Sequence, residues 1–91
     1  MHFEFDARKD AANLLKHGIG LADAARVLLD PDRLDLPVGR KDYGEERRIV
    51  VGAIARRVLV VVYTWRGDAV RLISARRANE REQKRYHALR D

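Results

Sequence analysis

The sequence has no cysteine, and only two prolines and six glycines among its 91 residues. Without cysteine the chain has no disulfide framework and no thiolate metal site, and nothing in it requires an oxidising compartment. The N-terminus has neither the basic region nor the apolar region of a secretory signal. No apolar run approaches the ~20 residues that span a membrane. We therefore expect a protein of the reducing cytoplasm that makes no membrane contact.

The signatures of several enzyme classes are also missing. The sequence contains no glycine-rich phosphate loop, no His-Glu-x-x-His helix and no nucleophile elbow. Its three histidines, His2, His17 and His87, lack the spacing of metal ligands. We therefore expect neither a metal nor a cofactor.

The composition is that of one folded domain. The chain has a mass of 10.5 kDa, is 46% hydrophobic and 36% charged, and contains no repeat or low-complexity tract. A chain of this length supports a single hydrophobic core, and this balance of residues is typical of a compact protein rather than a disordered one. We expect residues 1–91 to form one domain.

The net charge of +5 is unevenly distributed. Residues 1–45 carry seven Lys and Arg against nine Asp and Glu, a balance of −2, whereas residues 46–91 carry twelve against five, a balance of +7. Eleven of those twelve are arginine, which suits bidentate contacts to phosphate or carboxylate. The sequence therefore indicates a polyanionic partner, although a basic surface also serves solubility alone.

The N-terminal half has clear element boundaries. Alternation at residues 3–5 predicts a short strand, and Asp6 is a suitable N-cap for a helix over residues 7–16 that Gly18 ends. Apolar residues at helical spacing predict a second helix over residues 21–29, capped by Gly20. Residues 31–45 hold both prolines and predict a connector, the most mobile stretch of the chain, with a short extended piece at 34–36.

The C-terminal half is dominated by β-branched runs. They predict strands over residues 48–54, 57–64 and 69–75 in an antiparallel meander with 57–64 at its centre, covered on both faces. A final helix over residues 79–89 has little apolar face, and we expect Ala78, Tyr86 and Leu89 to anchor it only weakly. The fold class is α+β, a small twisted antiparallel sheet with two N-terminal helices packed on it and a C-terminal helix.

Several residues are candidates for chemistry. Lys16 and His17 fall in the last turn of the first helix, where they suit either phosphate binding with proton transfer or simple capping of the helix dipole. Arg76 and Arg77 follow the last strand, which would hold them rigidly near a phosphate, whereas the alternative is an ordinary solvated charge run.

Other candidates depend on the strand register or on helix packing. Because side chains alternate along a strand, at most one of Arg47 and Arg48 faces the helix-covered side. Tyr86 and its neighbour His87 are candidates for stacking or proton transfer. Tyr63 and Trp65 share a strand face where they would stack a base, although a core tyrosine and a hairpin tryptophan are the commoner explanations.

Five segments follow one another in a specific order, with Lys-His-Gly closing the first helix, Gly-Glu-x-Arg opening the sheet and Ile-Ser-Ala-Arg ending it. They are Phe3-Glu4-Phe5-Asp6, Asn13-Leu14-Leu15-Lys16-His17-Gly18, Ala24-Ala25-Arg26-Val27-Leu28, Tyr43-Gly44-Glu45-Glu46-Arg47 and Arg71-Leu72-Ile73-Ser74-Ala75-Arg76-Arg77-Ala78. This set closely resembles the BrnT family of bacterial toxins over nearly the whole chain. Gly20 departs from the pattern, since relatives often have a serine or threonine cap there.

The resemblance implies a RelE-like ribonuclease fold and the toxin half of a type II toxin–antitoxin pair. It also implies a BrnA-like antitoxin whose ribbon-helix-helix domain binds operator DNA, so that operator DNA is reached only through the complex, which represses its own operon. RNA is the implied substrate, and inhibition of translation and growth the implied outcome.

Within the matching motifs, the residues carried over as catalytic are Lys16, His17, Arg47 and Arg76. We expect metal-independent cleavage through attack of a ribose 2′-hydroxyl on the adjacent phosphate, with His17 transferring the proton and Arg76 stabilising the transition state. Lys16 and Arg47 would bind the flanking phosphate. Arg48, Arg77 and Tyr86 are the expected RNA-binding residues.

Two rival functions use the same basic surface. In the first, the chain is a non-enzymatic binding module whose arginines receive an acidic antitoxin segment and support DNA repression. In the second, the chain binds DNA by itself, which ranks low because no recognition-helix motif stands out. A pH-dependent rate that is lost in His17→Ala would separate the enzyme from the binding module.

Overall fold

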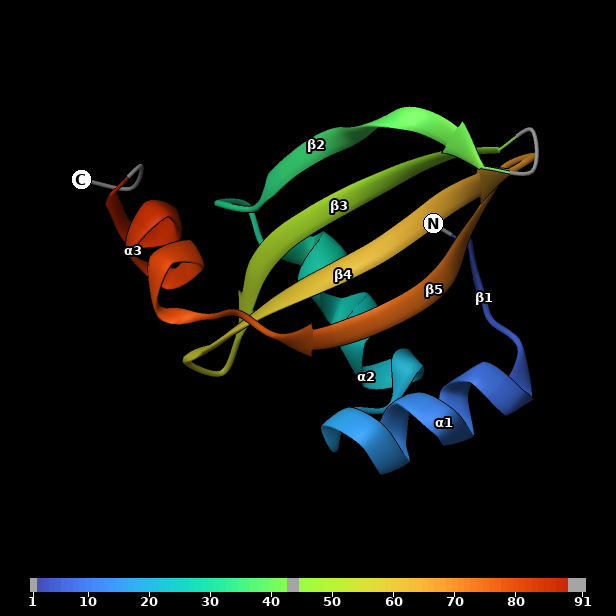
Figure 1. The fold of residues 1–91 in the computed structure, drawn as a ribbon, viewed down its shortest axis with the longest axis horizontal. Coiled ribbons are helices and arrows are strands. Elements are labelled where there is room, and N and C mark those ends of the chain that lie inside the picture. The colour runs from blue at the N-terminus through green and yellow to red at the C-terminus, as the bar shows by residue number, and fades with distance from the viewer. Residues whose placement is uncertain (1, 43–44, 89–91) are drawn as a thin grey trace.

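The computed structural model describes residues 2–42 and 45–88 and places one five-stranded sheet against helices (Figure 1). Along the chain the elements are β1 (His2–Glu4), α1 (Ala7–His17), α2 (Leu21–Ala24), the 3₁₀ helix η1 (Ala25–Leu29), β2 (Leu34–Asp42), β3 (Glu45–Ile54), β4 (Arg57–Arg66), β5 (Ala69–Arg77) and α3 (Glu80–Ala88). The strand order is β1-β5-β4-β3-β2. The α+β class is as predicted, with β4 at the centre.

The expected meander is confirmed for β3, β4 and β5, which pair antiparallel in sequence. The sheet as a whole is mixed, however, because β1 adds to the free edge of β5 in the parallel sense, with Phe3 opposite Val70. A parallel pair needs a long crossover, which the rest of the chain between the two strands supplies. The prediction of a purely antiparallel sheet was therefore wrong at this one edge.

The prediction for residues 31–45 was also wrong. In place of a connector with a short extended piece, Leu34–Asp42 forms an edge strand paired with β3. Pro37 is tolerated because an edge strand has one side without a ladder, and the register shifts after it. The missed signal was the alternation of Leu34, Leu36 and Val38 with polar or proline residues. Tyr43 and Gly44, also in the predicted connector, lie outside the described residues.

Both ends of α1 match their predicted caps. The Asp6 side chain accepts from the Arg8 N–H, and Gly18 takes the left-handed conformation at φ 71°. The second predicted helix is divided into α2 and η1, so that its last turn tightens to 3₁₀ geometry. Gly20 offers no side-chain cap, but Asp10 Oδ1 accepts from the Leu21 N–H at 2.7 Å and takes over this role.

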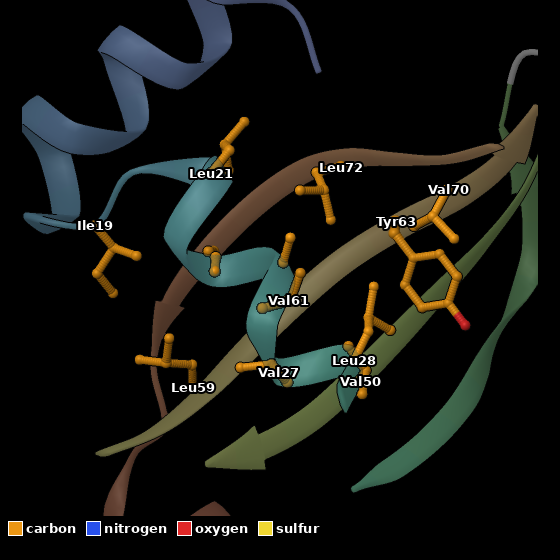
Figure 2. Close-up of a cluster of buried hydrophobic side chains, with 13 residues drawn as sticks. Ile19, Leu21, Val27, Leu28, Val50, Leu59, Val61, Tyr63, Val70 and Leu72 are labelled. Carbon is orange, nitrogen blue, oxygen red and sulfur yellow. The ribbon is translucent and has the colours of Figure 1, made fainter. Parts of the chain in front are cut away.

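The main core lies between the sheet and the helices α2 and η1 (Figure 2). Its most buried members are Leu21, Val27, Val50, Val61, Val70 and Leu72. Each such side chain contributes roughly 1.5–3 kcal/mol on burial. Gly52 lets η1 approach β3 closely, because a Cβ at this position would lie 2.7 Å from Val27 Cγ1.

A second core forms on the opposite face of the sheet, under α3. Val51, Val58 and Val60 pack there with Ala78 and Tyr86. Both faces of β4 are thus buried along most of its length, as its apolar sequence predicted. The α3 contact covers one end of this face only, and Ile49, Val62 and Ser74 remain partly exposed beside it.

The anchoring of α3 is stronger than the sequence predicted. Tyr86 is only 1% exposed, and its hydroxyl donates to the carboxylate of Asp30, which also accepts from the Ala53 N–H at 2.8 Å. One carboxylate therefore joins the end of η1, β3 and α3. Leu89, the third predicted anchor, lies outside the described residues.

Candidate functional site

The side of the sheet opposite α1 and α2, beyond the part under α3, is here called the uncovered face. The strand register fixes its cross-strand rows, since paired residues in neighbouring strands share a face. One end holds the row of Arg47, Thr64 and Arg71, and the middle holds Ile49, Val62 and Ser74. The other end is the border with α3, where Arg76 follows Val60 and Val51, the two valines that α3 covers. The face therefore has a partly apolar floor with arginines at both ends.

The register also settles the question of Arg47 and Arg48. Arg47 pairs with Thr64 and lies on the uncovered face, whereas Arg48 pairs with Tyr63 on the side of the helices. The prediction that only one of them joins the helix-covered side is therefore confirmed. Sequence alone left open which one, because that depends on the register of β3 against β4.

Arg71 is a member of the uncovered face that was not among the candidates for chemistry. Its Nη1 lies 3.3 Å from Glu4 Oε1, and Arg66 Nε lies 3.9 Å from the same oxygen. The row that starts at Arg47 thus ends at an acid on β1, which Arg71 opposes across the parallel pair. The parallel pairing of β1 brings this acid to the site, and no local pattern predicts it.

At the other end of the face, a carboxylate of α3 holds Arg76. Its Nη1 and Nη2 donate to Glu82 Oε1 and Oε2 at 2.8 and 2.9 Å, a bidentate pair. Hydrogen bonding to Glu82 raises the pKa of Arg76, and hydrogen bonding to Arg76 lowers the pKa of Glu82. Both groups are therefore charged at neutral pH, and the fork of Arg76 is occupied by an anion.

Glu82 also caps the helix that carries it. The Asn79 N–H donates to Glu82 Oε1, and the Glu82 N–H donates to Asn79 Oδ1, both at 2.8 Å. This reciprocal pattern is a capping box, which fixes the start of α3 and the position of its carboxylate. Asn79 and Glu82 stand three residues apart in the sequence, so this spacing was a usable signal that the sequence analysis missed.

Arg77 lies on a different surface from Arg76. It pairs with Leu59, whose side faces the helices, and it lines a hollow of about 170 Å³ together with Arg56 and Arg57 of the β3–β4 hairpin. The hairpin turns at Ala55 and Arg56, both at positive φ. This hollow brings Arg77, a predicted RNA-binding residue, next to two arginines about twenty residues earlier in the sequence.

Lys16 and His17 end α1 beside β5. The preceding turn is fixed by buried Asn13, whose Nδ2 donates to the carbonyls of Ile19 and Ala75 and whose Oδ1 accepts from the Ala75 N–H. Asn13 thus satisfies backbone groups on the edge of β5 that β1 is too short to pair.

The structure does not bring the four predicted catalytic residues into one cluster. Arg47 and Arg76 share the uncovered face but lie on rows opposite Thr64 and Val60, about 13 Å apart along β4. Within residues 2–42 and 45–88, no hydrogen bond or ion pair joins Lys16 or His17 to Arg76.

Tyr86, predicted to bind RNA, is a core residue in this structure because its ring is buried and its hydroxyl bonds Asp30. The ring of His87 meets it edge-on at 5.2 Å between centroids.

Arg48, Asp35 and Tyr63 form a further polar group, on the helix-covered side of the sheet. Arg48 Nε donates to Asp35 Oδ1 at 2.9 Å, and the Tyr63 hydroxyl donates to Asp35 Oδ2 at 2.5 Å. Figure 2 shows that hydroxyl turned away from the core toward β2. Burial, then the bond to Asp35, raises the pKa of Tyr63 to about 12, so it stays protonated at neutral pH.

In the part of the chain that the structure describes, no three His, Asp or Glu side chains gather closely enough to hold a metal ion. No helix there is long and apolar enough to cross a membrane.

Comparison with known proteins identifies the family. Residues 5–82 match the family described as the ribonuclease toxin BrnT of type II toxin–antitoxin systems. No protein of curated function matches the chain. The matched span begins at Phe5, directly after β1, and ends at Glu82 in the first turn of α3, so it includes Arg47 and Arg76 at the two ends of the uncovered face. The chain therefore belongs to the BrnT family of type II toxin–antitoxin ribonuclease toxins.

Proposed function

We propose that this chain is a metal-independent endoribonuclease that binds RNA across its uncovered face and so inhibits translation and growth. Family membership carries the ribonuclease assignment. The supporting observation for the surface is that Arg47 and Arg71 stand at one end of a partly apolar sheet face and Arg76 at the other. Arginines that flank an open strip suit successive phosphates of one RNA strand.

The proposed reaction uses the RNA's own 2′-hydroxyl. As its oxygen bonds to the adjacent phosphorus, its proton passes to solvent water, the bond from phosphorus to the 5′ oxygen breaks, and that oxygen takes up a proton from solvent. The products are a cyclic phosphate and a free 5′-hydroxyl. Arg76 stabilises the charge that develops on the phosphoryl oxygens, and Arg47 holds a flanking phosphate. For this, the phosphate must replace Glu82 on the fork of Arg76.

Lys16 and His17 form a second proposed centre, separate from the first. There His17 transfers the proton and Lys16 holds the phosphate, since both lie at the negative end of the α1 dipole. Arg48 and Arg77 are proposed to bind RNA outside the reacting phosphate. Single substitutions decide which centre carries the chemistry.

The proposed partner is a BrnA-like ribbon-helix-helix antitoxin, which neutralises the toxin and carries it to operator DNA to repress their operon. One observation favours the alternative function, a non-enzymatic module that only receives this antitoxin. Arg76 already donates two hydrogen bonds to a carboxylate in bidentate fashion, and an acidic antitoxin segment would offer the same group.

The test compares RNA cleavage in excess EDTA by the wild type, Arg76→Ala, His17→Ala and the control Arg81→Ala, which changes an exposed arginine of α3. We expect the wild type and the control to cut, and the variant of the true catalytic centre to lose ~100-fold or more in rate. A loss below about threefold in a variant removes that residue from catalysis. Intact RNA with the wild type, together with normal growth of cells that express it, would favour the binding module.

A further inference from the structure

Trp65 is a large aromatic side chain that the proposed reaction does not use. It is the only tryptophan of the chain, it is 50% exposed, and it follows the buried Tyr63 on the same face of β4. With Glu46, Arg48 and Thr64 it lines an open hollow of about 210 Å³ at the end of the sheet. An indole that is half in solvent beside a cavity presents a face to a ligand.

The indole rests on a rigid support. Tyr63 meets it edge-on, with ring centroids 6.3 Å apart and an interplanar angle of 78°. Tyr63 is itself 3% exposed and is held by its hydrogen bond to Asp35, which also holds Arg48. A supported ring loses little conformational freedom when a ligand stacks on it, so this geometry favours stacking.

The surroundings of Trp65 favour a nucleobase over a protein partner. The aromatic anchors of protein interfaces cluster near the centre of an interface in well-packed, fully desolvated pockets. Here the hollow is open and is lined by the carboxylate of Glu46, the guanidinium of Arg48 and by Thr64. An aromatic face beside a cationic group is the usual arrangement for single-stranded nucleic acid, in which the ring stacks a base and the cation contacts a phosphate.

We propose that Trp65 and Arg48 form a nucleobase subsite, in which one unpaired base of a single-stranded RNA stacks on the indole. The proposal rests on the proposed function, because it assigns a specificity subsite to the same substrate. The subsite lies on the side of the sheet opposite Arg47, at the same end, so a bound strand passes over the end of the sheet between them. The reacting phosphate is elsewhere, and Trp65 contributes to binding.

Because Trp65 is the only tryptophan, its fluorescence reports the subsite directly. The probe is a short single-stranded 2′-O-methyl oligonucleotide, which cannot undergo attack by its own 2′-oxygen. We expect saturable quenching by this probe and none by the same sequence as a duplex, whose bases are stacked inside the helix. In parallel, fluorescence anisotropy of a dye-labelled probe measures affinity in Trp65→Ala, Trp65→Phe and the control Leu15→Ala, which removes a side chain 90% exposed on α1.

Loss of one stacked base weakens binding by about 5- to 150-fold, so we expect a loss in this range for Trp65→Ala, a smaller loss for Trp65→Phe and none for Leu15→Ala. In cleavage, Trp65→Ala should raise KM with little change in kcat. Equal thermal stability of the variants confirms that they fold.

Three results would overturn the proposal, and they differ in what they leave standing. If the probe binds but Trp65 is not quenched and Trp65→Ala binds equally well, the subsite is wrong while RNA binding remains. If the wild type binds no probe and cuts no RNA, the proposed function fails as well. Quenching by an antitoxin peptide but not by the probe would assign the indole to a protein interface instead.

Discussion

At the scale of single residues, Glu82 is the least expected feature of the candidate site. It caps α3 through Asn79 and neutralises Arg76, the arginine proposed to stabilise the transition state. Any anion that uses the fork of Arg76 must compete with this carboxylate. Glu82 therefore lowers the affinity of the site for phosphate while it keeps Arg76 in a fixed orientation.

We predict that Glu82→Gln binds single-stranded RNA about twofold to fivefold more tightly than the wild type, since a partly exposed ion pair is worth at most about 1 kcal/mol. Glutamine still serves in a capping box, so α3 should stay folded. The measurement is anisotropy with the non-cleavable probe. Glu80→Gln is the matched control, because it removes an equal charge from the same helix. The carboxylate of Glu80 pairs with Lys84 rather than with Arg76. Equal gains in both variants would mean that only net charge matters.

The sequence predicted the arginines better than their partners. Arg76 stands out because it follows a β-branched run directly, and the alternation rule places Arg47 and Arg48 on opposite faces. Their partners are Glu82 on α3, Glu4 on β1 and Asp35 on β2, and tertiary packing sets the place of these three elements. Local patterns carry no information on how such elements pack against the sheet.

At the scale of elements, the errors have two physical causes. The strand β2 was read as a connector because proline and glycine interrupt it, yet an edge strand tolerates both where it lacks a second neighbour. The helix α3 was expected to dock weakly because it has little apolar surface. It is held instead by the buried ring of Tyr86 and by two contacts to carboxylates, Tyr86 to Asp30 and Arg76 to Glu82. A count of apolar side chains does not include such polar contacts.

The link between α3 and the body of the protein yields a stability prediction. Tyr86→Phe keeps the ring but removes the hydroxyl that donates to Asp30. A hydrogen bond to a charged group is worth about 1.5–3 kcal/mol, so we expect a loss in this range in the free energy of unfolding. Urea unfolding of Tyr86→Phe, Asp30→Asn and the double variant measures it. A coupling energy near zero in this cycle would show that the pair does not hold α3.

At the scale of the whole molecule, the uneven charge of the sequence becomes a spatial arrangement. The basic second half supplies β3, β4, β5 and α3 (Figure 1). The strand register places its arginines on both faces and at both ends of the sheet. The acidic first half supplies the carboxylates of Glu4 and Asp35 that orient some of them. Because the cationic groups are spread over several surfaces, they favour an RNA strand that wraps around the sheet rather than a ligand held in one pocket.

This arrangement makes RNA binding depend on salt concentration, and the strength of that dependence reports the number of phosphate contacts. For single-stranded nucleic acid, the logarithm of the binding constant falls with the logarithm of salt concentration with a slope of about −0.7 for each neutralised phosphate. We predict that Arg47→Ala reduces the steepness by about 0.7, because it removes one phosphate contact at the end of the uncovered face. Lys9→Ala, which removes an exposed charge from α1, should leave the slope unchanged.

Probe titrations between 50 and 200 mM NaCl measure both slopes. If the slope becomes shallower by the same amount in both variants, RNA responds to the net charge of the protein and the uncovered face has no special role. If the slope becomes shallower only in Arg47→Ala, the RNA strand lies along the uncovered face. The same series with Trp65→Ala should then weaken binding at every salt concentration without changing the slope, since base stacking releases no counterions from phosphate.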